Sequence, residues 1–171
     1  MKIMSSKTYQ NKSNIVWTFT NQRQLTKSEF INYFDRKLFR TIRKHQLLAK
    51  NKIFKLKHSN DLNTNVLTSI LQNKFEVKPS AKPNTSTNNL SKTAEQIFEQ
   101  ILKGNYKLKT PPTPLLYLSD KEIELYAKLQ NIQGTKRKQN KKIQSLFQQF
   151  MPQNQDLELN ILKAATQLDN R

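Results

Sequence analysis

The feature that most restricts the fold is a strong helix signal that begins at Thr26. Thr26 and Glu29 form a capping box, in which each side chain satisfies a backbone N–H of the other residue at the start of a helix. Phe30 and Phe34 follow about one helical turn apart, so their side chains lie on the same face. The pattern predicts an amphipathic helix over residues 26–48, with its apolar face turned to a core.

Shorter signals of the same kind fill most of the remaining sequence. Ile15, Trp17 and Phe19 alternate with other residues, as in a half-buried strand, and residues 52–57 alternate likewise. Further helices are predicted over 64–75, from 91 to a terminal Gly104, from a second capping box at Ser119 and Glu122 to Gly134, over 143–151, and over 157–168. A group of prolines precedes Leu115–Leu118, which we expect to be extended.

The predicted fold is therefore mostly α, with a small N-terminal β element, a long basic helix and a C-terminal helical bundle. Residues 78–90 contain two prolines, no aromatic residue and mostly Ser, Thr and Asn, which predicts a linker. The linker separates two segments, 1–25 and 26–77, from a helical C-terminal region at 91–171. The basic helix and the strand after it belong to the second of these segments.

The charge of the chain points to an anionic partner. Thirty Lys and Arg residues against twelve Asp and Glu residues give a net charge of +18, and only 35% of the residues are hydrophobic. Clustered cations bind nucleic acid through the release of its counterions, so tRNA or another RNA is the first candidate partner. Ordinary solvated faces, enriched in Lys by codon usage, remain the alternative. The two clusters are Arg36, Lys37, Arg40, Arg43 and Lys44 on the first helix, and Lys136, Arg137, Lys138, Lys141 and Lys142 further on.

Several classes of site are excluded or disfavoured. The chain has no cysteine, which rules out disulfides, cysteine-ligated zinc and thiol nucleophiles. His45 and His58 are the only histidines and have no carboxylate partner pattern, so we expect no metal and no cofactor. No apolar stretch approaches the roughly 18–20 residues of a membrane span, and the first residues lack the apolar region of a signal peptide. We expect a cytoplasmic protein with no membrane partner.

Aromatic and acidic residues add weaker candidates. Trp17, Tyr33 and Tyr117 could stack on RNA bases, with burial in the core as the alternative. Glu95 and Glu99 share a helix face, and we attribute them to pairing along the helix rather than to acid–base chemistry.

Four segments, in order, resemble the archaeal and eukaryotic cytosolic tRNA 2-thiouridine synthases, which are PP-loop ATPases. Residues 30–44 read FINYFDRKLFRTIRK and resemble the family's first long helix. Residues 88–96, NNLSKTAEQ, are similar to its HNLDDxAET stretch, and residues 114–127, PLLYLSDKEIELYA, to its KPLxYxxEKEIxLYA segment. Residues 135–168 resemble its C-terminal end. The resemblance implies that 26–77 carries the remnant of an α/β PP-loop domain and that 1–25 is related to a zinc ribbon.

The departures from the family pattern are also informative. The glycines of the family's SGGxDS phosphate loop are missing at the matching positions, which are Ser59, Asn60, Asp61, Asn63 and Thr64. Glycine there lets backbone N–H groups approach a phosphate closely. The paired aspartates expected after Leu90 are Ser91 and Lys92, and family members are roughly twice as long. Hydroxyl residues such as Ser5, Ser6 and Thr8 stand near the zinc-ribbon cysteine positions and cannot hold zinc.

The resemblance implies an ancestral reaction in which ATP adenylates the C2 oxygen of a tRNA uridine and sulfur displaces AMP. Because the residues for that chemistry are absent, we expect a non-catalytic tRNA-binding relative that acts beside a full-length catalytic paralogue, or as a homodimer. A general basic RNA- or DNA-binding helical protein with no thiolation role is the alternative. A chain that has lost the ancestral activity without gaining another is a third interpretation.

Overall fold

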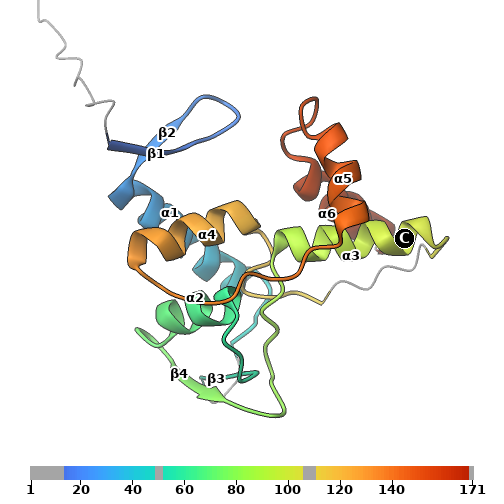
Figure 1. The fold of residues 1–171 in the computed structure, drawn as a ribbon. Helices are drawn as coiled ribbons and strands as arrows, with labels where there is room; N and C mark the ends of the chain where they lie inside the picture. Colours follow the sequence, from blue (N-terminus) through green and yellow to red (C-terminus); the bar gives the residue numbers. More distant parts are fainter. Residues whose placement is uncertain (1–13, 49–51, 106–110, 170–171) are drawn as a thin grey trace, which may run out of the picture.

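A computed structural model describes residues 14–48, 52–105 and 111–169, which form six helices and two small sheets (Figure 1). The strands are β1 (Ile15–Thr18), β2 (Gln24–Thr26), β3 (Ile53–Leu56) and β4 (Glu76–Pro79). The helices are α1 (Lys27–Lys44), α2 (Leu62–Leu71), α3 (Leu90–Leu102), α4 (Asp120–Gln130), α5 (Lys141–Phe150) and α6 (Leu157–Asp169). The predicted mostly α class with a small N-terminal β element is confirmed. The zinc-ribbon positions Ser5, Ser6 and Thr8 lie outside the described residues.

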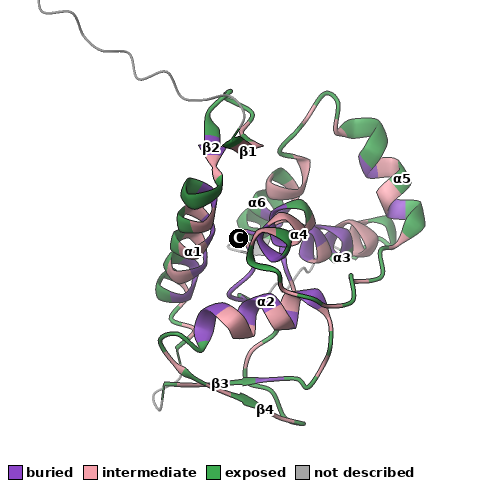
Figure 2. Ribbon diagram, turned by 60° about the vertical axis from the view of Figure 1, so that its left-hand side comes forward, coloured by how far each residue is buried: buried purple, intermediate pink, exposed green. Residues whose placement is uncertain are grey.

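The N-terminal hairpin and α1 follow the sequence signals closely. β1 and β2 pair antiparallel, with Trp17 opposite Leu25. The Glu29 carboxylate accepts a hydrogen bond from the Thr26 backbone N–H at 2.8 Å, as the capping box predicts. Helix α1 ends at Lys44, before the predicted end at residue 48, and His45 is its C-cap. One side of α1 is buried along its length (Figure 2).

β3, α2 and β4 form a small β–α–β unit, in which the two strands are parallel. Its second strand corrects the predicted linker, because Lys78 and Pro79 lie in β4. A proline is tolerated there since each strand of a two-stranded sheet is an edge. The segment after β4 is also held in place: the Asn84 side chain accepts a hydrogen bond from the Lys55 N–H at 2.8 Å and donates one to the Ile53 carbonyl at 3.1 Å.

Two predictions in the C-terminal region are wrong. Leu115–Leu118 is not extended but forms successive turns, in which the Leu116 N–H donates to the Thr113 carbonyl and the Leu118 N–H to that of Leu115. Burial of this segment explains its apolar composition. Helix α4 ends not at Gly134 but at Gln130, and its C-cap Asn131 adopts the left-handed conformation with φ +56°. Asparagine tolerates that conformation well because its short polar side chain bonds locally.

The core crosses the boundary that the sequence suggested at 78–90. Its main cluster joins α1, β3, α2 and α4, and the rings of Phe34 in α1 and Tyr126 in α4 stack with centroids 4.2 Å apart. Smaller clusters join α3 to α6 and α3 to α5. Buried positions lie along each of these helices (Figure 2). Among the helices in the described part of the chain, none combines the length and hydrophobicity that a membrane span requires.

Candidate functional site

The positions that match the family's phosphate loop lie between β3 and the first turn of α2, in the strand–loop–helix setting that a phosphate loop needs. Here Asp61 occupies the helix N-terminus with its own carboxylate. Asp61 Oδ1 accepts a hydrogen bond from the Thr64 N–H at 2.9 Å, and Oδ2 accepts one from the Thr64 hydroxyl at 2.7 Å. Burial alone would raise the pKa of Asp61, but hydrogen bonds from Ser59 and Thr64 lower it below its usual value. An internal anion thus satisfies the site that would attract a phosphate.

The segment after α4, residues 133–140, closes the same helix end from outside, and we call it the strap. The Leu62 N–H of α2 donates to the Thr135 carbonyl at 2.9 Å, and the Thr135 N–H donates to the Asn60 carbonyl at 2.8 Å. Gly134 allows this contact, because a Cβ there would stand 2.8 Å from the Leu62 Cα. The N–H groups of Leu62 and Thr64 in the first turn of α2 are therefore engaged within the protein, and the Asp61 carboxylate beside them repels an anion, so a nucleotide phosphate does not fit this loop.

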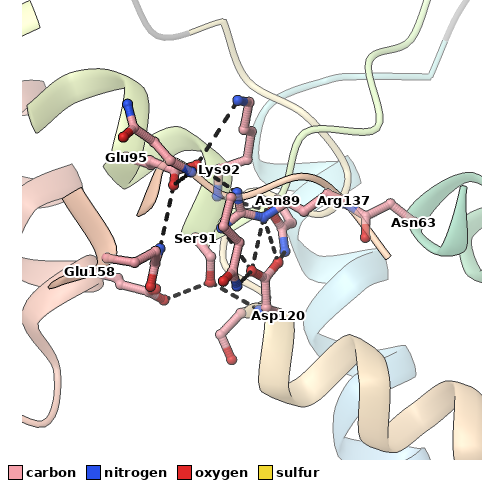
Figure 3. Close-up of polar contacts among 12 residues, drawn as sticks. Asn63, Asn89, Ser91, Lys92, Glu95, Asp120, Arg137 and Glu158 are labelled. Carbon is pink, nitrogen blue, oxygen red and sulfur yellow. Dashed lines mark hydrogen bonds and ion pairs between the residues drawn. The ribbon is translucent and has the colours of Figure 1, made fainter. Parts of the chain in front are cut away.

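Arg137 anchors the strap in a buried ionic network (Figure 3). Its Nε donates to both Asp120 oxygens, at 2.9 and 2.8 Å, and its Nη1 lies 2.5 Å from Glu95 Oε2. The Arg137 side chain is only 13% exposed. Burial alone would lower the pKa of its guanidinium, but Asp120 and Glu95 raise it above its ordinary value. The structure therefore corrects the grouping of Arg137 with the exposed cations of 136–142.

Glu95 belongs to the same network and was missed as such by sequence reasoning. Its side chain is 2% exposed, and its Oε1 accepts a hydrogen bond from the Asn140 N–H at 2.6 Å, while Lys92, its partner along the helix, is 4.0 Å away. Pairing along the helix is thus only a minor part of the surroundings of Glu95, whose main partners are Arg137 and Asn140. The signal that could have found it is its place beside Ala94 and near Ile97, on the buried face of α3.

Ser91 links this network to α6. Its hydroxyl donates to Glu158 Oε2 at 2.8 Å and accepts a hydrogen bond from the Asp120 N–H at 2.9 Å (Figure 3). Asn89 caps α3 and also donates to Asp120 Oδ1 at 2.7 Å. The carboxylates are thus committed to protein groups, and within the described residues no cluster of His, Asp and Glu could hold a metal ion.

A cavity of about 230 Å³ lies between the start of α2, the start of α4 and the strap, lined by residues that include Asn63, Asp120 and Arg137. Sites for small molecules commonly measure about 300–1,000 Å³. The cavity is therefore small for a nucleotide. With its loop closed by Asp61 and the strap, this region is a structural junction of α2, α3 and α4.

A larger groove lies between α1 and the C-terminal end of α2, with a volume of about 760 Å³. Arg36, Arg40 and Arg43 of α1 line it, and Lys74 joins them from the segment after α2. We call this the basic groove. The structure thus brings together three of the five predicted cations of the first helix with one that the sequence did not single out.

The other two cations of that helix point elsewhere. The Lys37 ammonium donates to Glu122 Oε1 at 2.8 Å and to the Tyr33 hydroxyl at 2.7 Å. The Lys44 ammonium lies 5.4 Å from the centre of the Tyr117 ring. In the second cluster, Lys136 pairs with Glu124 at 2.6 Å, while Lys138, Lys141 and Lys142 are exposed.

The three candidate stacking residues are partly committed within the protein. Trp17 packs on Phe30 with ring centroids 5.4 Å apart. The Tyr33 hydroxyl donates to Glu122 at 2.6 Å, and burial together with that carboxylate raises the pKa of Tyr33. Tyr117 stacks beside His45, and its hydroxyl lies 3.3 Å from His45 Nε2.

The whole chain is similar in fold to a known enzyme. A U34-tRNA thiolase, NcsA, from Methanococcus maripaludis, solved with its 4Fe-4S cluster, superposes with a TM-score of 0.74 and 12% sequence identity. The match covers 100% of this chain and 89% of that chain. No family model matches the chain, and no curated protein matches it significantly. The likeness is therefore one of fold. Cysteine thiolates hold such clusters, and since the chain has no cysteine, its residues do not fit one.

Proposed function

We propose that this chain binds tRNA through the basic groove and takes part in tRNA thiolation as a non-catalytic relative of the thiolases. The single observation that carries the proposal is the convergence of Arg36, Arg40, Arg43 and Lys74 on one groove of a chain with a net charge of +18. The fold likeness to a tRNA thiolase supports the choice of tRNA among polyanions.

The geometry of α1 suits a phosphate backbone. A helix rises about 1.5 Å per residue, so Arg36 and Arg43 are separated by roughly 10 Å along α1, with Arg40 between them. All three are exposed. Guanidinium groups bind phosphate oxygens through paired hydrogen bonds, and such contacts position RNA without reading its sequence. An RNA strand that follows α1 would therefore meet a row of cations.

The non-catalytic part of the proposal is supported by the loop before α2. Asp61 and the Thr135 carbonyl take the N–H groups of Thr64 and Leu62, and Asp61 places a negative charge where a triphosphate would lie. In this role the sulfur chemistry belongs to a partner, for which an intact full-length paralogue is the candidate.

The purified chain should neither hydrolyse ATP nor release AMP in the presence of unmodified tRNA. Radiolabelled ATP and thin-layer chromatography measure both products. A buffer blank is the negative control, and a catalytically active tRNA thiolase, which releases AMP, is the positive control. Sustained AMP release that depends on tRNA would contradict the non-catalytic assignment.

Reversing two charges of the groove tests RNA binding. Arg40→Glu combined with Arg43→Glu should weaken tRNA binding and reduce the steepness of its salt dependence by about one unit for each lost phosphate contact. The matched control is Lys82→Glu combined with Lys163→Glu, which changes the net charge equally at exposed residues outside the groove. Equal losses in the two double variants would mean that only net charge matters, and would remove the groove from the interface.

A general affinity for nucleic acid is the second candidate, and one observation favours it. Lys138 in the strap and Lys141 and Lys142 in the first turn of α5 are all exposed. Lysines on such a surface bind phosphates of RNA and DNA alike. If this candidate is right, a variant with these three lysines changed to Gln should lose affinity for RNA and for DNA equally.

A further inference from the structure

The basic groove contains more than cations. Its lining includes Phe39, which is partly exposed, and the buried residues Ile42 and Ile70, and we call these three apolar residues its floor. The Lys74 ammonium lies 4.2 Å from the centre of the Phe39 ring. Lys74 is exposed, so its ammonium can leave the ring for a phosphate without unpacking the core.

The groove is also lined by one acidic residue, so a bound nucleotide has a preferred orientation in it. Asp35 lines the groove and is partly buried, and Oδ1 accepts a hydrogen bond from the Tyr126 hydroxyl at 3.0 Å. Burial raises the pKa of Asp35, against smaller opposing effects of Tyr126 and Lys74. A phosphate is repelled from a carboxylate, whereas a base amino group can donate to it. Phosphates therefore belong with the arginines, and a base belongs on the floor.

We propose that the basic groove holds an unpaired nucleotide of RNA, with its base against Phe39 and its phosphates along Arg36, Arg40 and Arg43. This inference rests on the proposed RNA binding and names the form of RNA that is bound. Proteins that bind single strands combine a cationic groove with aromatic platforms for the bases. A duplex keeps its bases stacked inside, so it can reach the arginines but not the floor.

The test compares RNA forms and aromatic variants by fluorescence. A single-stranded oligonucleotide with 2-aminopurine at its centre reports stacking, and a hairpin duplex with the same number of phosphates is the reference. Phe39→Leu should weaken single-strand binding by at least about five-fold and abolish the quenching of 2-aminopurine, since stacking contributes about 1–3 kcal/mol per base. Duplex binding should not change.

The matched control is Phe75→Leu. Phe75 belongs to the same aromatic group, with its ring 6.4 Å from that of Phe39 and 5.3 Å from that of Phe54, but it does not line the groove. Phe39→Tyr keeps a ring of similar size and should retain quenching, which separates a lost platform from a damaged fold. Circular dichroism checks that each variant is folded.

The outcomes separate this inference from the proposed function. Tighter binding of the single strand, lost in Phe39→Leu and kept in Phe75→Leu and Phe39→Tyr, supports it. If reversal of Arg40 and Arg43 weakens binding while single strand and duplex bind alike and the two leucine variants behave alike, the groove binds RNA but holds no base, and this inference is overturned. If neither RNA form binds, the proposed function fails and this inference fails with it.

Discussion

Glu158 illustrates how the surroundings of a single carboxylate have opposing effects on its ionised form. It lies at the start of α6 and accepts a hydrogen bond from Ser91, close to the carboxylate of Asp120. Burial raises the pKa of Glu158 above its usual value; Ser91 lowers it in part, and the charge of Asp120 raises it further. The ionised form is thus less favourable in the folded chain than in the unfolded one. Its contribution favours folding at low pH and is lost as the pH rises through the raised pKa.

Glu158→Gln should therefore stabilise the protein near neutral pH. The glutamine oxygen can still accept the Ser91 hydrogen bond, and the side chain carries no charge that needs solvation. In acid, where Glu158 is protonated in both states, the difference should disappear. Urea unfolding at a series of pH values measures the free energy of unfolding of both proteins. A glutamine variant that is less stable at neutral pH than at low pH, relative to the natural chain, would contradict this account.

At the scale of elements, the strap joins three helices, two of them through the Arg137 side chain and the third through the Thr135 backbone. Arg137 reaches Asp120 at the start of α4 and Glu95 within α3, while Thr135 bonds the first turn of α2. Removing one member of a buried ion pair leaves the other charge without a partner, which costs about 3–5 kcal/mol. The strap therefore helps to fix the relative positions of α2, α3 and α4, together with the core contacts between α2 and α4.

Arg137→Met should destabilise the protein by about 3–5 kcal/mol. The neighbouring residue offers a matched control: Lys136 pairs with Glu124 on the surface, with side chains 68% and 39% exposed. Exposed pairs contribute about 1 kcal/mol or less, so Lys136→Met should have a small effect. Chemical denaturation measures both losses. Similar small losses for the two variants would show that Arg137 does not hold the strap.

The helices could be predicted from sequence because their signals are local. The capping boxes at Thr26 and Ser119 and the apolar stripes needed no knowledge of the rest of the chain. The site could not be predicted in the same way. Arg137 stands between Lys136 and Lys138 in one basic run, and only tertiary structure separates the buried guanidinium from its exposed neighbours. Lys74 joins the basic groove from a different element, so no local pattern could place it there.

Errors in the predicted boundaries have the same origin. Leu115–Leu118 has the composition of a strand, yet it folds into buried turns because it packs between the clusters of the core. Gly134 was predicted to end a helix, but its missing side chain serves the close approach of the strap to Leu62. In each case a long-range contact decided what the local pattern left open.

For the whole molecule, the central feature is how the charge of +18 is distributed. Part of it is neutralised within the fold, where Lys37 pairs with Glu122 and Arg137 with Glu95 and Asp120. The remainder includes the arginines that line the basic groove beside its apolar floor. It also includes the exposed lysines Lys138, Lys141 and Lys142, which do not line that groove. Counterion release alone would bind any nucleic acid and would weaken steeply with salt. Selective binding of tRNA needs the shaped surface.

The most direct test of this account is competition between unmodified tRNA and duplex DNA of matched charge for the purified chain, at low and at physiological salt. Fluorescence anisotropy of labelled tRNA measures the bound fraction. We predict that tRNA stays bound at physiological salt in the presence of excess DNA. The reason is that stacking of a base on Phe39 adds to the arginine–phosphate contacts, and salt does not screen stacking. The contrary result is that DNA displaces tRNA as readily as unlabelled tRNA does and that both dissociate together as salt rises. In that case the positive charge binds nucleic acids without selectivity, and tRNA binding is not the function of this chain.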